Sequence, residues 1–297
     1  MNKADRPNSM RPRRSALYMP GANVKALEKA KAVPADVLIF DIEDSVAPEG
    51  KAEARANIVS VLQAGGYGAR EIVVRVNSLS TPWGAEDVKA AAAAKPHAVL
   101  FPKVSSAADV EAAEASLRAA GAPADTGLWA MIETPLAILN IRDIAAASAK
   151  SRLACFVVGT NDLAKDQRAQ TTPGREAFLA SLTLCVLAAR AFGLSALDGV
   201  HNDIADAAGF EAVCRQGAML GFDGKTLIHP SQLGPCNEIF APAAGEVEQA
   251  HAIIAAFAAP ENAGKGVIKV AGRMTELLHL EQARRTVAIA EAISAMA

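Results

Sequence analysis

The chain has 297 residues, of which 51% are hydrophobic and 21% charged, and its formal net charge is −2 at pH 7. A chain of this size buries a large core, and its near-neutral charge offers no attraction for nucleic acid or an anionic membrane surface. Only 4% of the residues are aromatic, which argues against platforms on which bases stack. We therefore expect one large α/β domain, alone or with an appendage.

The N-terminal segment is polar and basic, and no apolar stretch of signal-peptide length follows it. No window of the sequence approaches a membrane span. We interpret residues 1–14 as a flexible tail and expect a cytoplasmic protein. The cysteines fit a reducing compartment, because they show neither CxxC nor metal-ligand spacing. They are Cys155, Cys185, Cys214 and Cys236.

Short apolar runs alternate with Ala-rich amphipathic segments through most of the chain. Most runs are apolar on both faces, as is typical of parallel strands covered by helices on both sides. We predict strands at 15–19, 37–42, 71–76, 98–101, 128–133, 153–158, 195–200 and 219–228. Helices are predicted at 51–63, 85–95, 107–120, 135–149, 175–192 and 203–216. This alternation predicts a (β/α)8 TIM barrel. A doubly wound sheet is the alternative, but no GxGxxG motif follows the first strand.

The pattern changes after residue 230. A turn-rich stretch precedes a predicted helix at 246–259, a short extended piece at 267–270 and a second helix at 276–296. This tail is too small to stand alone. We predict a barrel at 15–233 and a C-terminal lid at 234–297 that packs on the barrel or on a neighbouring subunit.

Glu133 stands at the end of an apolar strand, and Pro135 opens a helix two residues later. A carboxylate at the end of a hydrophobic strand is unfavourable unless something pairs with it. A salt bridge with a buried arginine is the commoner explanation, and a metal or substrate is the alternative.

Nearly every predicted strand ends in an ionisable or polar group, and in a barrel these ends build the active site. Capping or a salt bridge explains any one of them, but the whole set points to function. The groups are Tyr18, Asp41, Glu43, Asp44, Arg75, Asn77, Lys103, Glu133, Asp162, Asp198, Lys225 and His229.

Glu133 and Asp162 follow adjacent predicted strands, so their carboxylates can converge on one ion. Two carboxylates with water and substrate oxygens are a typical Mg²⁺ site, and no His or Cys cluster favours zinc. Glu43 and Asp44 would accept hydrogen bonds from metal-bound waters. Arg75 would pair with a substrate carboxylate or carbonyl, and with the metal would bear the charge of an enolate.

Eight short motifs occur in order at the predicted strand ends. They are SALYMPG (15–21), FDIEDSVAP (40–48), VRVN (74–77), FPK (101–103), IETP (132–135), GTNDLA (159–164), GFDGK (221–225) and IHPS (228–231). Together they resemble the citrate lyase beta subunit family. That family belongs to the HpcH/HpaI aldolase superfamily, with malyl-CoA and citramalyl-CoA lyases as relatives. The resemblance covers nearly the whole chain from about residue 14.

The resemblance implies a TIM barrel with a C-terminal lid, assembled as a homotrimer or hexamer. Its activity would be cleavage or formation of the C–C bond of a short 3-hydroxyacyl-CoA, with CoA thioesters and small keto acids as substrates and Mg²⁺ as cofactor. By position, Glu133 and Asp162 would bind the metal and Arg75 would hold the substrate. Further matches to CoA or substrate contacts are Tyr18, Lys25, Lys29, Lys51, Arg55, Ile228 and His229. Lys25 and Lys29, four residues apart, also fit a solvated helix face.

One position departs from the family pattern. Related lyases carry a lid motif Gly-x-Met-x-Asp whose Asp acts as the acid/base, and here residues 272–276 read GRMTE. The side chain of Glu276 is one methylene longer than that of the Asp in the motif. Misplacing a catalytic group by roughly 1 Å can reduce a rate on the order of a hundredfold. We expect a Mg²⁺-dependent C–C lyase for malyl-CoA or citramalyl-CoA, with Arg75 and Glu276 as its catalytic residues. The alternatives are a 2-keto-acid aldolase, an acyl-CoA thioesterase and a non-catalytic acyl-CoA-binding subunit.

Overall fold

The computed structural model describes residues 11–296, which fall into two compact units. The larger unit is Arg13–Phe240, and the other combines residues 11–12 with residues 241–296. Of the predicted tail, residues 1–10 lie outside the described residues. The larger unit extends beyond the predicted barrel by two residues at its start and by seven at its end.

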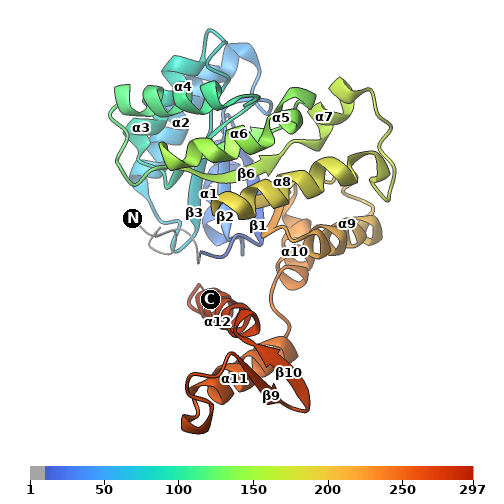
Figure 1. The fold of residues 1–297 in the computed structure, drawn as a ribbon. Helices are drawn as coiled ribbons and strands as arrows, with labels where there is room; N and C mark the ends of the chain where they lie inside the picture. The colour runs from blue at the N-terminus through green and yellow to red at the C-terminus, as the bar shows by residue number, and fades with distance from the viewer. Residues whose placement is uncertain (1–10, 297) are drawn as a thin grey trace. The chain divides into compact units, whose positions relative to one another are not determined.

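The larger unit is a closed barrel of parallel strands in sequence order, with β8 hydrogen-bonded back to β1 (Figure 1). The strands are β1 Ser15–Pro20, β2 Val37–Asp41, β3 Glu71–Arg75, β4 Ala98–Phe101, β5 Gly127–Ile132, β6 Leu153–Val158, β7 Ser195–Asp198 and β8 Gly224–Leu227. This confirms the predicted (β/α)8 fold. The last strand is shorter than the predicted 219–228, because helix α9 continues to Leu220. Gly221 then ends that helix with a φ of +95°.

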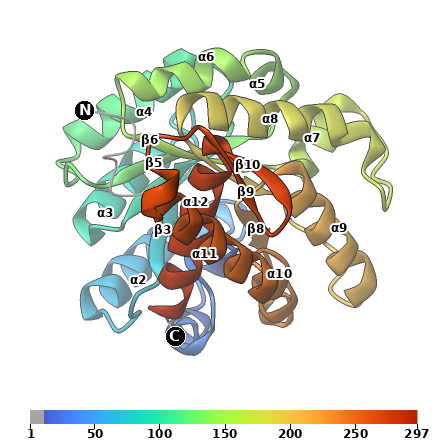
Figure 2. The ribbon, with the colours of Figure 1, turned by 60° about the horizontal axis from the view of Figure 1, so that its bottom comes forward.

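Helices surround the strands, as Figure 2 shows. They are α1 Val24–Lys29, α2 Lys51–Ala64, α3 Gly84–Ala94, α4 Ala107–Ala119, α5 Pro135–Leu139, α6 Ile141–Ala146, α7 Thr160–Gln167, α8 Leu179–Phe192, α9 Ala207–Leu220 and α10 Leu233–Ile239. Short 3₁₀ turns lie at Ala30–Ala32, Pro48–Gly50, Ala147–Ala149, Glu176–Phe178 and Pro230–Gln232. No helix of the described residues has the length and apolarity to cross a membrane.

Alternate residues of strands β1 to β7 enter two separate cores. In β2, Val37 and Ile39 pack inside the barrel, whereas Leu38 and Phe40 join the layer between strands and helices. Trp129 is the largest side chain of the inner cluster. Both faces of the strands are therefore apolar, which is the pattern that predicted them. All four cysteines are buried free thiols.

An ion pair closes the end of the barrel at which the strands begin. Arg13 donates from Nε and Nη2 to the two carboxylate oxygens of Glu71 at 2.6 and 2.8 Å, and both side chains are buried. The guanidinium also lies 5.0 Å from the ring centroid of Trp129 and donates to Ser195 Oγ. Arg13 thus belongs to the barrel rather than to the predicted tail. At this end of a barrel such contacts serve stability.

We expect Glu71→Gln to destabilise the protein by about 3–5 kcal/mol, because it leaves a buried guanidinium without its counter-charge. The urea midpoint of unfolding measures this. Glu86→Gln is the matched control, since Glu86 pairs with Lys89 on the exposed face of α3. Its midpoint should stay close to that of the wild type. Equal midpoints for the two variants would contradict a structural role for the Arg13–Glu71 pair.

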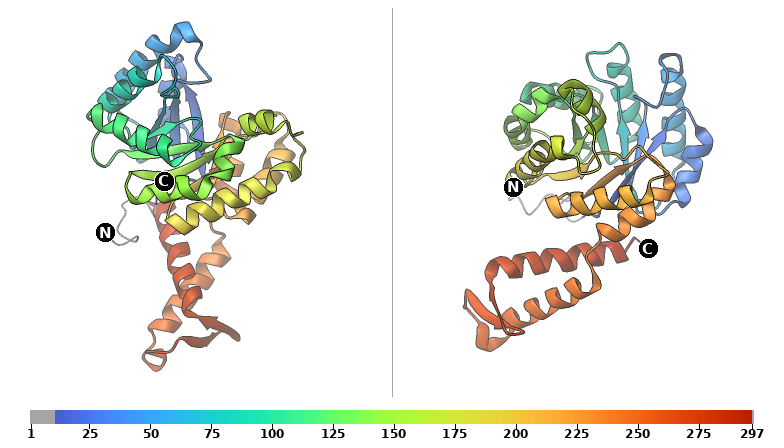
Figure 3. Two further views of the ribbon diagram at one scale, coloured as in Figure 1. Left: turned by 45° about the horizontal axis from the view of Figure 1, so that its top comes forward. Right: turned by 90° about the vertical axis from the view of Figure 1, so that its right-hand side faces the viewer.

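The C-terminal unit is a β-hairpin with two helices, α11 Ala244–Ala258 and α12 Leu277–Ser294. Strands β9 Val267–Val270 and β10 Arg273–Glu276 pair antiparallel, and a 3₁₀ turn at Pro260–Asn262 precedes them. The two helices lie side by side (Figure 3). Strand β10 was not predicted, because its sequence RMTE offers no alternation of apolar residues.

Candidate active site

A cavity of about 300 Å³ lies at the carboxyl ends of the barrel strands. This is the end at which the catalytic groups of such barrels converge. Its lining comes from strands β1, β2, β3, β5, β6 and β8 and from the segments that follow β2, β5, β6, β7 and β8. The residues are Tyr18, Asp41, Asp44, Ser45, Arg75, Met131, Glu133, Val158, Gly159, Thr160, Asn161, Asp162, Val200, Asn202, Thr226 and Ile228.

Glu133 directly follows β5 and is 2% exposed. Its Oε1 accepts the backbone N–H of Lys103 at 2.7 Å. Burial raises the pKa of Glu133 to about 7, the Lys103 amide opposes the rise, and the Asp162 charge adds to it. A cation beside this carboxylate would favour its charged form, and the role of Glu133 as a metal ligand stays a prediction.

The carboxylate of Glu133 rests directly on the backbone of Gly159, the residue after β6. A Cβ at Gly159 would lie 2.5 Å from both Cβ and Oε2 of Glu133. We expect Gly159→Ala to displace Glu133 and to weaken Mg²⁺ binding, measured by titration calorimetry, with a loss of about 1–3 kcal/mol in folding stability. Gly234→Ala, where a Cβ meets open space, is the control. Unchanged Mg²⁺ binding in Gly159→Ala would contradict this role.

Asp162 lies in the first turn of α7 and shares the cavity with Glu133. Its Oδ1 accepts from Lys103 Nζ at 2.9 Å. Lys103 therefore contacts both carboxylates, one through its backbone and the other through its side chain. Burial alone would lower the pKa of Lys103, but the hydrogen bond to Asp162 and the Glu133 charge raise it. The sequence placed Lys103 at a strand end and in the FPK motif without giving it a role.

Arg75, the last residue of β3, is buried, and Asp41 holds one edge of its guanidinium. Its Nε and Nη2 each donate to one carboxylate oxygen of Asp41 at 2.7 Å, and its guanidinium lies 4.6 Å from the Tyr18 ring centroid. Burial would lower the pKa of Arg75, but the adjacent Asp41 carboxylate raises it well above its ordinary value. Arg75 therefore stays charged and lines the cavity. Asp41 orients it, a role that the sequence did not indicate.

The two acids after β2 lie beside Nη1 of Arg75. Glu43 Oε2 is 2.8 Å from Nη1 and Asp44 Oδ2 is 3.4 Å from it. Glu43 Oε2 is buried, yet among the described residues it has no hydrogen-bond donor of suitable geometry. It is therefore an acceptor for a donor such as a metal-bound water.

Burial raises the pKa of Glu43 to about 8, against the opposing charge of Arg75. The pKa of this carboxyl is higher in the folded than in the unfolded state, so the folded protein binds more protons between about pH 4.5 and 8. We expect the EDTA-treated protein to lose stability as the pH rises through this window. Glu43→Gln should reduce the loss by at least about 1.4 kcal/mol, measured as urea unfolding at pH 5 and 8.5. Parallel profiles for wild type and variant would contradict the raised pKa.

The donor set fits Mg²⁺. Among the described residues no group of three His, Cys, Asp or Glu side chains is arranged to hold a metal. A cation at this site would be held by Glu133 and Asp162 and would complete its shell with water and substrate oxygens. Mg²⁺ is typically bound in this way, and Glu43 Oε2, which lacks a hydrogen-bond donor of suitable geometry among the described residues, offers its waters an acceptor.

Lys51 and Arg55, predicted as CoA or substrate contacts, make hydrogen bonds within the protein and do not line this cavity. Lys51 Nζ is buried and donates to the carbonyls of Ile42 and Glu43 and to Asn77 Oδ1. It fixes the segment that carries Glu43. Arg55 donates to the buried Asp87 at 2.8 Å.

The other predicted contacts are divided between the cavity and the surface. Tyr18 and Ile228 line the cavity, and burial raises the pKa of the Tyr18 phenol, which keeps it neutral. His229 follows Ile228 and accepts the amide of Ser231 on Nδ1. Lys25 and Lys29 are exposed on α1 and lie outside the cavity lining.

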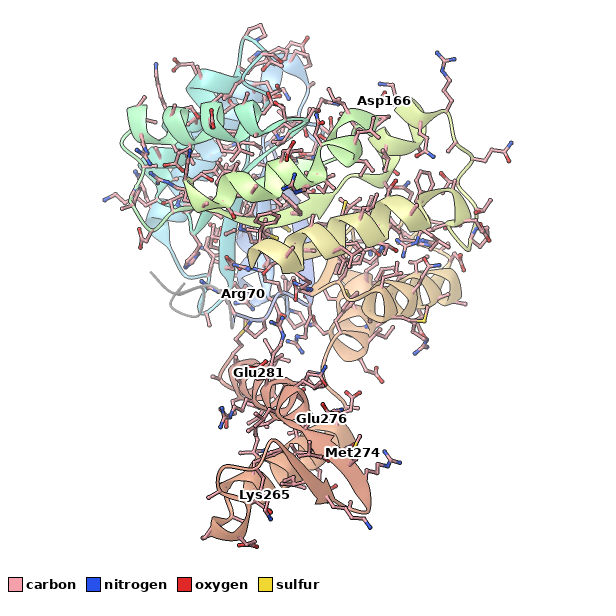
Figure 4. All side chains as sticks on the ribbon, viewed as in Figure 1. Arg70, Asp166, Lys265, Met274, Glu276 and Glu281 are labelled. Atoms are coloured by element: carbon pink, nitrogen blue, oxygen red, sulfur yellow. The ribbon has the colours of Figure 1, made fainter. Side chains whose placement is uncertain are left out.

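Glu276 belongs to the C-terminal unit, where it is the last residue of β10 and the N-cap of α12 (Figure 4). Its backbone N–H donates to His279 Nδ1 at 3.0 Å, and its side chain is partly exposed. Its role as acid/base stays a prediction.

Curated relatives match nearly the whole chain. A (3S)-malyl-CoA thioesterase of Cereibacter sphaeroides (strain ATCC 17029 / ATH 2.4.9) is 49% identical over 284 residues, which are 96% of each chain. Citrate lyase subunit beta of Escherichia coli (strain K12) is 36% identical over 95% of this chain and 94% of its own. An L-malyl-CoA/beta-methylmalyl-CoA lyase of C. sphaeroides is 35% identical over 96% of each chain.

This chain is also similar to solved structures of related proteins. CitE from Mycobacterium tuberculosis, in complex with magnesium, acetoacetate and coenzyme A, is 28% identical with a TM-score of 0.75. That similarity covers 95% of this chain and 99% of CitE. The family model described as HpcH/HpaI aldolase/citrate lyase matches residues 14–230, which include every cavity-lining residue. The chain therefore belongs to the HpcH/HpaI aldolase/citrate lyase family.

Proposed function

We propose that this protein is a Mg²⁺-dependent enzyme acting on a short 3-hydroxyacyl-CoA thioester such as malyl-CoA. One observation carries the proposal: Glu133 and Asp162, from adjacent strand ends, line one cavity with the charged edge of Arg75. The similarity to CitE, whose structure contains magnesium, acetoacetate and coenzyme A, supports it. Three intact functional groups in one cavity speak against a non-catalytic subunit.

Glu133 and Asp162 would hold the ion. Magnesium, when bound there, supplies Lewis-acid polarisation of the substrate's carbonyl oxygen. A cavity of about 300 Å³ matches the small end of ligand pockets, so it suits the acyl group rather than the whole thioester.

Arg75 would bind the oxyanion that develops on the substrate, through its Nη1 edge. Asp41 holds the guanidinium through Nε and Nη2, so the position of Arg75 is set before charge develops on the substrate. Glu276 would move the proton at the reacting carbon or at the attacking water.

Two bonds of such a substrate are candidates for cleavage. We propose thioester hydrolysis as the net reaction, because the 49% identical relative is a malyl-CoA thioesterase and Glu276 departs from the lyase motif. C–C cleavage, the prediction from the sequence, is the second candidate. The malyl-CoA lyase and citrate lyase relatives at 35–36% identity favour it. Both reactions develop negative charge on the carbonyl oxygen, so the same Arg75 and metal site serves either.

Product analysis separates the candidates. The EDTA-treated protein is incubated with (3S)-malyl-CoA, with and without added Mg²⁺, and the products are separated by chromatography. Hydrolysis releases malate and free CoA, whereas C–C cleavage gives glyoxylate and acetyl-CoA. We expect Mg²⁺-dependent release of free CoA. Acetyl-CoA as the main product would support the lyase, and equal turnover without metal would overturn the proposal. The predicted homo-oligomer and cytoplasmic location stay predictions.

A further inference from the structure

Lys103 contacts both carboxylates of the proposed metal site through two separate groups. Its backbone N–H donates to Glu133 Oε1 at 2.7 Å, and its Nζ donates to Asp162 Oδ1 at 2.9 Å. The residue adopts a φ of +56°, in the left-handed region that side-chain-bearing residues seldom occupy. From this backbone conformation the amide contacts the residue that follows β5, and the ammonium contacts a residue in the first turn after β6.

We propose that Lys103 is a displaceable counter-ion of Asp162, which occupies the metal-binding oxygen in the metal-free protein and leaves it when Mg²⁺ enters. This inference rests on the metal site of the proposed function. Two carboxylates that share a cavity repel each other when no cation lies between them. The Lys103 ammonium relieves that repulsion, and a divalent ion bound to the same oxygens would replace it.

The two groups of Lys103 differ in how readily they can leave. The side chain is 47% exposed, so the ammonium can move from Asp162 into solvent without disturbing the core. The backbone amide stays on Glu133. Lys225, the second residue of β8, shows the contrasting case: its side chain is 1% exposed and is fixed on the buried Asp198. Of these two lysines, only Lys103 is placed for exchange.

If Mg²⁺ replaces the Lys103 ammonium on Asp162, the lysine must affect the Mg²⁺ affinity of the site. An ammonium a few ångströms from a divalent ion repels it and competes for the same oxygen. Removing the ammonium should therefore tighten Mg²⁺ binding by about tenfold, the size expected for a screened repulsion of this kind. The metal-free protein should become less stable at the same time, because the two carboxylates lose their counter-charge.

Titration calorimetry with MgCl₂ on the EDTA-treated full chain tests both effects, together with thermal unfolding before and after Mg²⁺ addition. We expect Lys103→Met and Lys103→Gln to bind Mg²⁺ about tenfold more tightly than the wild type. Both should have a lower unfolding temperature without metal, and Mg²⁺ should restore it. Lys103→Arg, which keeps the charge, should not tighten binding.

Lys165→Met is the matched control. Lys165 stands on α7, three residues after Asp162, but its nearest carboxylate is Asp166 at 4.0 Å and its side chain is 78% exposed. The substitution removes a charge of the same sign from the helix that carries Asp162, without touching the metal-binding oxygen. Its Mg²⁺ affinity should stay within about twofold of the wild type, because solvent and salt screen an exposed charge.

Each other outcome overturns the inference in a distinguishable way. Unchanged or weaker Mg²⁺ binding in both neutral Lys103 variants would show that the lysine is not displaced, with the metal site itself intact. Equally tighter Mg²⁺ binding in Lys165→Met would show that any loss of positive charge near the site tightens binding. The effect would then not depend on the Lys103–Asp162 contact. Absence of Mg²⁺ binding in the wild type and in both neutral variants would overturn the metal site and the exchange together.

Discussion

Replacing Glu133 by Gln is expected to lower Mg²⁺-dependent turnover of malyl-CoA on the order of a hundredfold or more. Even groups that only orient a metal ligand contribute 10–100-fold, and Glu133 is proposed as a ligand itself. The amide keeps the shape of the side chain and can still accept the Lys103 N–H, so the fold should persist. Steady-state rates over a Mg²⁺ titration measure the loss.

Two aspartates of α7, Asp162 and Asp166, provide the matched comparison for this substitution. Asp162→Asn should reproduce the loss, whereas Asp166→Asn, four residues later and outside the cavity lining, should leave turnover near that of the wild type. Thermal unfolding of each variant separates a chemical loss from a folding defect. Full activity in a folded Glu133→Gln variant would contradict the assignment of Glu133 to the metal.

Arg75→Lys should reduce kcat/KM on the order of 10²–10³-fold, as removal of one oxyanion donor does elsewhere. Lysine cannot bond both oxygens of Asp41 and also present a donor to the cavity, because its charge is a single point at the end of a flexible stem. We expect a larger change in kcat than in KM, since the contact strengthens as charge develops on the substrate.

A second arginine provides the control for this substitution. Arg190 on α8 donates to Asp223 at 2.9 Å outside the cavity lining, and Arg190→Lys should keep the wild-type kcat. Rates at saturating and at limiting substrate separate kcat from KM for both variants. A change in KM alone for Arg75→Lys would mean that Arg75 only binds the ground state.

Much of the barrel was predictable, because both faces of its strands are apolar and the strand spacing is regular. The errors lie where local sequence is ambiguous. Helix α7 begins directly after β6 and is short and polar, so no apolar periodicity marks it. Helix α10 carries Gly234 and Pro235 at its start and falls in the stretch predicted as turns, although proline is tolerated in the first turn of a helix. The predicted helix at 135–149 divides at Asn140 into α5 and α6.

The strand-end rule brought Glu133, Asp162 and Arg75 to one place, and the structure puts them in one cavity. The rule does not predict how each of these side chains is oriented in the cavity. That Asp41 holds one edge of Arg75 depends on how two neighbouring strand ends turn toward each other. For the same reason the sequence does not show that Lys51 Nζ donates to the carbonyls of Ile42 and Glu43.

The most direct measurement is a crystal of the protein soaked in Mn²⁺ as a heavier substitute for Mg²⁺, with an anomalous difference map. The proposed site predicts one strong peak within about 2.2 Å of a carboxylate oxygen of Glu133 and of Asp162, with the Lys103 ammonium moved off Asp162. A map with no peak between these two carboxylates, or with its strongest peak on other residues, would contradict the metal site and the function proposed from it.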